Sequence, residues 1–370
     1  MSALGVGQAD NLAALRAGTS GVGGLRFLET QLRDFPVGEV PYSNEELARM
    51  GGDVPSGWPR TSLMTAVALK EALAQAGLPD GRGMLLVGGT TVGGMDLTEK
   101  QFPHYAPSHG CGESTDLPAQ ALGFDGATTL STACSSAANA FIYGANLLRS
   151  GRCTRVVVGG SESLSSYHLN GFHSLMILDS EPCRPFDASR AGLNLGEGAA
   201  YLVLETVASA RERGAKPLAR LSGFGNACDA FHQTASSEDG EGAFLAMQKA
   251  LSMAGLSPED IGYVNAHGTG TPNNDASESA ALRRIFGEAL PPVSSTKPYT
   301  GHTTSASGSI EAVFCLLALS EGFLPGQLNW HTADPACITP CGPLQRKVDH
   351  ILCNAFGFGG NDSSLVLSRV

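Results

Sequence analysis

The chain has 370 residues, of which 42% are hydrophobic and 47 are glycine, a composition typical of a compact globular protein rich in tight turns. This length is too great for one small core and predicts either two domains or one large duplicated fold. The net charge of −11 argues against a nucleic acid or an anionic membrane surface as the main partner.

The cysteines and the first residues predict a cytoplasmic protein. Nine cysteines are scattered without paired spacing, and no basic region followed by an apolar run opens the chain. Both features favour a reducing compartment without structural disulfides. Residues 126–148 carry no charged side chain and are long enough to span a bilayer, but they are rich in Ser, Thr and Asn. We therefore expect a buried strand and a tightly packed helix there instead of a membrane segment.

An internal repeat predicts two similar halves. The pattern Ala-Leu-x-x-Ala-Gly-Leu at 72–78 returns at 250–256, an offset of 178 residues. Coincidence is one explanation, because a helix that ends in Ala-Gly-Leu before a strand is common, but duplication is favoured. We place the two halves at residues 1–205 and 206–370. The strands expected in this α/β chain lie at 84–87, 127–131, 155–159, 200–205, 218–223, 261–264, 293–295 and 351–355.

The segment from Thr132 to Ala140 places one cysteine, Cys134, where a strand turns into a long helix. Apolar spacing predicts that the helix ends at 150–151. At its start, unpaired N–H groups and the positive end of the helix dipole favour a thiolate, so we expect the pKa of Cys134 to fall well below about 8.5. Cys134 is then a candidate nucleophile. The alternative is that it is one more small buried residue.

Two histidines in the second half lie at similar junctions between a strand and a glycine-rich loop. His267 ends a predicted strand and precedes Gly-Thr-Gly-Thr, whose glycines permit close approach by a ligand. His302 follows Lys297 in a second such loop, and Glu311 lies on the next helix. Near the end of the chain, the glycines of 357–360 predict exposed backbone N–H groups suited to an oxyanion site. Each histidine alone is equally well explained as a satisfied turn residue, but the pair points to catalysis.

These motifs together closely resemble the β-ketoacyl-acyl-carrier-protein synthases of the thiolase fold, the condensing enzymes of the KAS I/II type. The match covers nearly the whole chain. The resemblance implies a five-layer αβαβα architecture of two similar halves, and a homodimer. The segments that carry it are Thr132-Ala-Cys134-Ser-Ser, the His267-Gly-Thr-Gly-Thr loop, Lys297-x-x-x-Gly-His302, Gly357-Phe-Gly-Gly360, Arg184-Pro-Phe-Asp187, Gly196-Glu-Gly-Ala199 and Asp229-Ala-Phe-His232.

The resemblance also implies a mechanism. Cys134 accepts an acyl group from the phosphopantetheine arm of an acyl carrier protein, and the N–H groups of Cys134 and Phe358 form the oxyanion hole. After malonyl-acyl carrier protein enters, His267 and His302 stabilise the enolate left by decarboxylation, and this carbanion equivalent attacks the acyl-cysteine. The product is a 3-oxoacyl-acyl carrier protein, in fatty-acid or polyketide and aryl-polyene synthesis.

Supporting roles follow from the same resemblance. Lys297, paired with Glu311, fixes the hydrogen bonds and electrostatics of the histidines. No metal or redox cofactor is implied, since the phosphopantetheine arm belongs to the carrier protein. The substrate-binding positions are Thr269 and Thr271 for pantetheine, Phe172 and the gating Phe358 for the acyl chain, and His232.

The chain departs from the family in two regions. It opens inside or after the family's first turn, so the first strand is missing or replaced. The segment 96–125, which helps to form the acyl pocket and the dimer contact, is shorter than usual. His104, His109 and Cys111 lie there with irregular spacing, so we expect a polar surface loop and no metal site.

Other functions remain open. A thiolase would require a second active-site cysteine, yet 357–360 offers only phenylalanine and glycine. A chain-length factor, the silent partner in a heterodimeric polyketide synthase, usually lacks the nucleophile that is present here. A specialised polyketide or polyene synthase uses the same residues with a different pocket, and a synthase-like heterodimer would then replace the homodimer.

Overall fold

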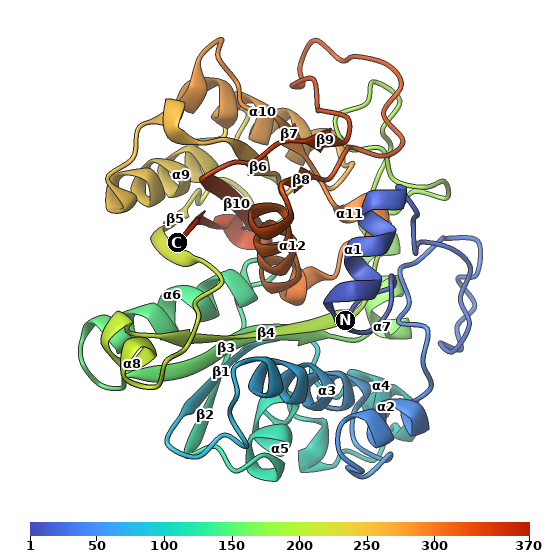
Figure 1. The fold of residues 1–370 in the computed structure, drawn as a ribbon. Coiled ribbons are helices and arrows are strands. Elements are labelled where there is room, and N and C mark those ends of the chain that lie inside the picture. The colour runs from blue at the N-terminus through green and yellow to red at the C-terminus, as the bar shows by residue number, and fades with distance from the viewer.

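Two β-sheets form the framework of the protein (Figure 1). The structure is a computed structural model that describes residues 1–370 except for the side chain of Ser108. The first sheet has the order β2-β1-β3-β4, with β1 at Leu85–Gly89, β2 at Gly126–Leu130, β3 at Arg155–Glu162 and β4 at Gly198–Glu205. The second has the order β5-β11-β10-β6-β7, with β5 at Arg220–Cys228, β6 at Tyr263–Asn265, β7 at Val293–Ser294, β10 at His350–Gly357 and β11 at Asn361–Ser368.

The two sheets share one topology, as the sequence repeat predicts. In the first, β1 lies parallel to β2 and β3, and β3 lies antiparallel to β4. In the second, β6 lies parallel to β7 and β10, and β10 lies antiparallel to β11. Leu85 pairs with Val156, while Tyr263, 178 residues after Leu85, pairs with Ile351. The sheets differ at one edge only, where β5 lies antiparallel to β11 and no strand of the described chain lies beside β4.

Helices complete five layers, αβαβα, in agreement with the expected thiolase fold. On the outer face of the first sheet lie α3 (Arg60–Gln75) and α5 (Glu113–Ala121). Between the sheets lie α6 (Ser136–Arg149) and α12 (Ser307–Glu321). The outer face of the second sheet is covered by α9 (Glu241–Ala254) and its neighbour α10 (Pro272–Phe286).

The uncharged segment noted in the sequence is β2 followed by α6. The expectation of a buried strand is wrong, because β2 lies at the edge of its sheet and none of its residues is buried, whereas α6 packs between the two sheets. Small residues let α6 approach β3 closely: a Cβ atom added to Gly144 would lie 2.3 Å from a methyl carbon of Val158. Because α6 is packed between two sheets, it needs no charged face. No helix in the described part of the chain is long and apolar enough to cross a bilayer.

The repeated Ala-Gly-Leu motif ends a helix in both halves. Gly77 after α3 and Gly255 after α9 both have φ +68°, the left-handed conformation that glycine adopts freely at helix ends. The remaining helices are α1 (Gly7–Ala17), α2 (Asn44–Met50), α4 (Met95–Gln101), α7 (Ser166–Ser174), α8 (Val207–Glu212) and α11 (Lys297–Thr300). Short elements are η1 (Pro107–His109), η2 (Pro258–Asp260), η3 (Thr304–Ala306), η4 (Phe358–Gly360), β8 (Phe323–Leu324) and β9 (Leu344–Gln345).

Two further expectations need correction. The strand expected at 218–223 is β5, which continues to Cys228. The segment with His104, His109 and Cys111 is not wholly a surface loop, because His109 is only 4% exposed. Sequence polarity cannot show that α4, η1 and α5 fold this histidine inward.

Candidate active site

Cys134 lies in a sharp turn between β2 and α6. Ala133 has φ +51°, a conformation that is strained for a residue with a Cβ atom and that persists at sites where the surroundings fix it. The turn ends where α6 begins at Ser136, so Cys134 lies next to the N-cap residue Ser135, close to the helix start as predicted. The residue is 5% exposed and lines a cleft.

Two histidine rings lie over this cysteine. His302, after α11, places Nε2 3.1 Å from the Cys134 sulfur. The ring of His267, after β6, lies edge-on to that of His302, with centroids 5.2 Å apart and an angle of 84° between the planes. The first half therefore supplies the sulfur and the second half both imidazoles.

A buried lysine determines the tautomer of His267. Lys297 Nζ lies 3.3 Å from His267 Nδ1 and 2.7 Å from Glu311 Oε1. Because an ammonium group only donates hydrogen bonds, Nδ1 of His267 accepts and the ring proton is on Nε2. His302 Nδ1 has a different partner, Ser307 Oγ, at 3.1 Å. The expected Lys297–Glu311 pair is thus present, and Lys297 contacts His267 directly.

Burial governs protonation in the site. It raises the pKa of Cys134 to about 12, although the Lys297 charge and the Phe358 N–H act in the opposite direction. Burial, followed by the charge of Lys297, lowers the pKa of both His267 and His302. The low thiol pKa expected from the helix start is therefore wrong, because desolvation outweighs the dipole. The resting pair is a neutral thiol beside a neutral imidazole, and a thiolate forms by transferring its proton to His302.

Backbone N–H groups converge on the sulfur. Those of Phe358 and of Cys134 itself favour the charged sulfur and act to lower its pKa. The chain before Phe358 comes very close to the Cys134 turn: a Cβ atom on Gly357 would lie 2.9 Å from the Thr132 carbonyl oxygen and 3.2 Å from the Cys134 nitrogen. A glycine is needed at this crossing, and it brings both N–H groups to one point, as an oxyanion hole requires.

The cleft above the sulfur, counted together with the solvent at its open mouth, spans about 840 Å³. Phe172 and Phe358 stack in its wall, with ring centroids 5.9 Å apart. The hydroxyls of Thr269 and Thr271 lie 2.9 Å from each other, and both residues line the cleft. The described lining residues are Cys134, Phe172, Ile177, Leu193, Thr234, Ala235, Ser236, His267, Thr269, Thr271, Pro272, Asn273, Asn274, His302, Phe356, Gly357, Phe358 and Gly360.

Among the predicted substrate-binding residues, His232 is the one that does not line the cleft. Its side chain is exposed, and its Nδ1 accepts a hydrogen bond from the backbone N–H of Thr234. Thr234 and Ser236 of the same loop line the cleft instead. Sequence order cannot show which residues of a loop face a cavity.

Two acidic residues of α10, not predicted from the sequence, hold the His267 loop. The Glu278 carboxylate accepts hydrogen bonds from the backbone N–H groups of His267, at 2.9 Å, and Gly268, at 2.8 Å. The Asp275 carboxylate accepts hydrogen bonds from the backbone N–H groups of Thr269 and Gly270. Pro272 at the start of a helix, followed by two acids three residues apart, is a sequence signal that could have identified them.

An amide network beneath the cysteine was also not predicted. Asn361 Oδ1 accepts hydrogen bonds from Ser135 Oγ at 2.8 Å, Asn139 Nδ2 at 2.8 Å and Asn226 Nδ2 at 2.9 Å. These residues come from α6 and its N-cap on one side, and from β5 and β11 on the other. The network joins the two halves directly behind the turn that holds the sulfur.

Replacing Glu278 with alanine should slow the reaction and destabilise the protein. The change leaves two buried N–H groups without an acceptor, and each such loss costs about 1–3 kcal/mol. We expect a lower unfolding temperature and a reduced condensation rate, measured by calorimetry and a product assay. Glu288→Ala, at an exposed position after α10, is the matched control. Equal behaviour of the two variants would contradict the positioning role of Glu278.

Replacing Lys297 with alanine should have a larger effect on stability. Lys297 and Glu311 are 1% and 3% exposed, so removing the lysine leaves a buried carboxylate unpaired, at a cost of roughly 3–5 kcal/mol. The condensation rate should fall too, because His267 loses the group that fixes its tautomer. Chemical unfolding and kinetics test both effects against Lys216→Ala in an exposed loop. Unchanged unfolding and unchanged kinetics would show that the pair contributes nothing.

Comparison with known proteins gives the class of this site. Residues 59–210 match the model of the β-ketoacyl synthase N-terminal domain, and residues 218–331 match that of the C-terminal domain. Nodulation protein E of Rhizobium meliloti is 38% identical over 84% of this chain and 82% of its own length. 3-Oxoacyl-[acyl-carrier-protein] synthase 2 of Vibrio cholerae is 39% identical over 65% of this chain and 62% of its own.

Solved structures agree with these relatives. The ishigamide ketosynthase/chain length factor matches with a TM-score of 0.92 and 31% identity, covering 100% of this chain and 96% of that one. A β-ketoacyl synthase from Burkholderia phymatum STM815 matches with a TM-score of 0.84 and 30% identity, covering 100% and 97%. The chain belongs to the β-ketoacyl synthase family. It is a ketoacyl synthase, an acyltransferase of the condensing class.

Proposed function

We propose that this synthase condenses an acyl group held on Cys134 with malonyl-acyl carrier protein, releasing carbon dioxide and a 3-oxoacyl-acyl carrier protein. One observation carries the proposal. A buried thiol 3.1 Å from His302 Nε2 shares its cleft with a second imidazole and with two backbone N–H groups that favour the charged sulfur. This arrangement supplies a nucleophile, a proton acceptor and an oxyanion hole.

The first step transfers the acyl group. The sulfur attacks the thioester carbonyl of the acyl carrier protein, and the thiol proton passes to His302 Nε2 across the 3.1 Å contact. The oxyanion accepts hydrogen bonds from the backbone N–H groups of Cys134 and Phe358. As the intermediate collapses, the bond to the pantetheine sulfur breaks, and this thiolate takes the proton back from His302. The acyl group is then a thioester on Cys134.

The second step is decarboxylation. Once Cys134 is acylated, the sulfur carries no proton, and the histidines face the incoming malonyl thioester. His267 donates from Nε2, because Lys297 occupies its Nδ1 side. His302 leaves the first step with its ring proton on Nδ1, so it donates from Nε2 only after changing tautomer, with Nδ1 then accepting from Ser307. The bond to the carboxylate breaks, carbon dioxide leaves, and the electron pair becomes an enolate held by these two donors.

The third step forms the carbon–carbon bond. The enolate carbon attacks the acyl-cysteine carbonyl, the oxyanion hole holds the tetrahedral intermediate, and the thiolate of Cys134 leaves. One proton taken up from solvent returns the cysteine to its neutral form. The balance closes without a metal or redox cofactor, since the phosphopantetheine arm comes with the carrier protein. In this scheme Thr269 and Thr271 bind that arm.

The stacked Phe172 and Phe358 support an acyl-binding role for the adjacent wall. Because the acyl-cysteine forms directly beside Phe358, moving this ring changes access to the pocket behind it. We propose a cytoplasmic synthase that works as a dimer with an acyl carrier protein as its substrate carrier. Both fatty-acid and polyketide or polyene synthesis fit this chemistry.

A panel of acyl carrier proteins loaded with saturated, polyunsaturated and aryl acyl groups tests the function and the substrate class together. Peptide mass spectrometry should find the acyl mass on the peptide that contains Cys134, most strongly for the preferred class. Transfer of no acyl group to Cys134, or transfer to another cysteine with condensation intact, would overturn the proposal.

A second candidate is a chain-length-factor-like partner in a heterodimer. Two matched structures, titled as a ketosynthase with a chain length factor, support a heterodimer of this kind. In such a pair this chain would be the catalytic subunit, because Cys134, His267, His302 and Lys297 are all present. Sedimentation of the protein alone should show one species of twice the chain mass if it is a homodimer. A monomer that becomes active only with a second synthase-like chain would establish the heterodimer.

A further inference from the structure

A buried carboxylate that the mechanism does not use, that of Glu162, joins the two halves of the molecule. Glu162 is the last residue of β3 and is fully buried. On the side of the first half, its oxygens accept hydrogen bonds from the backbone N–H groups of Thr91, at 2.9 Å, and Val92, at 3.1 Å. The hydroxyls of Thr90, at 2.6 Å, and of Thr91 donate to it as well. The segment that follows β1 therefore fixes the carboxylate.

On the side of the second half, the same carboxylate holds η3, the short helical turn that follows His302. The hydroxyl of Ser305 donates to Oε2 at 2.6 Å, and that of Thr304 lies 3.4 Å from the same oxygen. Thr304 has φ +42°, a conformation that is unfavourable for a β-branched residue and that persists where the surroundings fix it. The hydrogen bonds to Glu162 fix it here.

The turn η3 determines the place of the group that orients the His302 ring. The backbone of His302 is fixed separately, since its N–H donates to the Asn194 carbonyl at 2.7 Å and its carbonyl accepts a hydrogen bond from the N–H of Gly196 at 2.9 Å. On the side away from Cys134, the ring has one hydrogen-bond partner in the described chain: Nδ1 lies 3.1 Å from the Ser307 hydroxyl. Ser307 begins α12 directly after η3, so a shift of η3 would move this hydroxyl.

We infer that Glu162 is a positioning residue for His302: it holds η3 from the opposite half of the molecule, and η3 keeps the Ser307 hydroxyl against His302 Nδ1. The inference rests on the proposed function, in which His302 takes the thiol proton in the first step and donates to the enolate in the second. The alignment matters because the ring belongs to the second half and the sulfur to the first.

The backbone contacts of Glu162 require an acid and not an amide. One carboxylate oxygen faces the N–H of Val92, and the other faces the N–H of Thr91. An amide side chain would turn its NH₂ group toward one of these two donors, whichever way it is oriented. Glu162→Gln therefore keeps the size of the side chain but cannot accept all of the hydrogen bonds that fix this junction.

Position and charge predict opposite effects of Glu162→Gln on Cys134. Burial is the main cause that raises the pKa of Cys134, and the negative charge of Glu162 adds to this effect. A role by charge alone predicts that the variant eases thiolate formation, so that alkylation of Cys134 becomes faster. A misplaced His302 ring takes the thiol proton less readily, so the positioning role predicts slower alkylation.

Alkylation of Cys134 by iodoacetamide, followed by mass spectrometry of its peptide, measures this effect without a carrier protein. Glu162→Gln should slow the reaction at least about tenfold, a part of the roughly 100-fold or more that a positioned base contributes. Ser305→Ala removes the hydroxyl at the other end of the contact and should slow it in the same way. If Glu162→Gln does not fold, Ser305→Ala decides the question.

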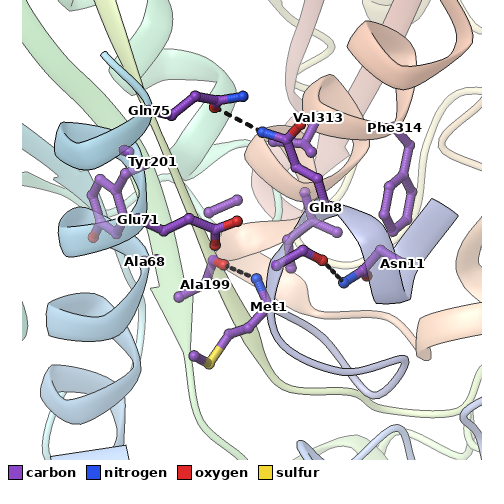
Figure 2. A pocket seen from close by; sticks show the side chains of 14 residues that line it. Met1, Gln8, Asn11, Ala68, Glu71, Gln75, Ala199, Tyr201, Val313 and Phe314 are labelled. Carbon is purple, nitrogen blue, oxygen red and sulfur yellow. Dashed lines mark hydrogen bonds between the residues drawn. The ribbon is translucent and has the colours of Figure 1, made fainter. Parts of the chain in front are cut away.

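Each variant has a matched control. Ser309→Ala makes the same change at a buried hydroxyl of α12 that bonds only to the Ala306 carbonyl. Glu71→Gln makes the same change at an acid that points into a groove beside Met1 and has no hydrogen-bond partner in the described chain (Figure 2). Both control proteins should be alkylated at the wild-type rate.

A His302→Ala background separates the positioning role from a merely structural one. Residues that act through one another have non-additive effects. In the wild-type background, Glu162→Gln should slow both alkylation of Cys134 and release of carbon dioxide from malonyl-acyl carrier protein. In the His302→Ala background, it should slow neither reaction further.

Equal or faster alkylation in the folded Glu162→Gln and Ser305→Ala proteins would overturn the positioning role, and so would the same slowing in the His302→Ala background. Condensation assays on the same samples distinguish this failure from failure of the proposed function. Wild-type protein that condenses no carrier-bound substrate would reject the function. A fully active Ser305→Ala protein beside an active wild type would reject only the role of Glu162.

Discussion

Replacing Cys134 with alanine should abolish acyl transfer and leave the fold intact. The sulfur lies beside His302 and is the nucleophile in the proposed mechanism, so we expect condensation to fall by at least about 1,000-fold. The free energy of unfolding should fall by only about 1 kcal/mol, because the variant loses one small buried group, the sulfur. Transfer of labelled acyl groups from the carrier protein and chemical unfolding measure the two effects.

Cys315→Ala is the matched control for this variant. Cys315 is fully buried in α12 and does not line the cleft, so its loss removes the same group from the core. It should cost similar stability and leave acyl transfer unchanged. Normal condensation by the Cys134→Ala protein would contradict the assignment of the nucleophile.

Replacing either histidine with alanine should separate the two half-reactions. Loss of one preorganised donor at an oxyanion costs on the order of 100- to 1,000-fold in rate, so His267→Ala and His302→Ala should release carbon dioxide from malonyl-acyl carrier protein at least tens of times more slowly. Some acyl label should still reach Cys134, most clearly in His267→Ala, because His302 contacts the sulfur and His267 does not. Cys134→Ala should retain decarboxylation without condensation.

Label on the protein and released carbon dioxide can be followed in parallel samples, with His331→Ala at an exposed position as the control. A wild-type rate of carbon dioxide release in both cleft variants would mean that the histidines do not stabilise the enolate.

Local sequence patterns predicted much of the fold and the polar groups of the site. The 178-residue repeat predicted two sheets of one topology. Cys134, His267 and His302 each follow a predicted strand, and this position indicated that their side chains lie in one site. These features depend on short stretches of chain, in which strand, turn and helix preferences agree.

Features that depend on packing between distant segments were not predictable. The thiol pKa is raised because both halves close over Cys134, which outweighs the helix start identified in the sequence. His232 lies outside the cleft because its loop turns Thr234 inward. The partnership of Glu278 with the His267 loop arises where α10 packs back against the end of β6.

The most direct test of the central claim is a single-turnover chase. Protein carrying a labelled acyl group on Cys134 is isolated, mixed with malonyl-acyl carrier protein, and sampled over time. Label should leave Cys134, appear in the 3-oxoacyl product, and accompany release of carbon dioxide, all with one rate constant. Product that forms while the label stays on Cys134 would show that this cysteine is not the site from which the acyl chain is condensed.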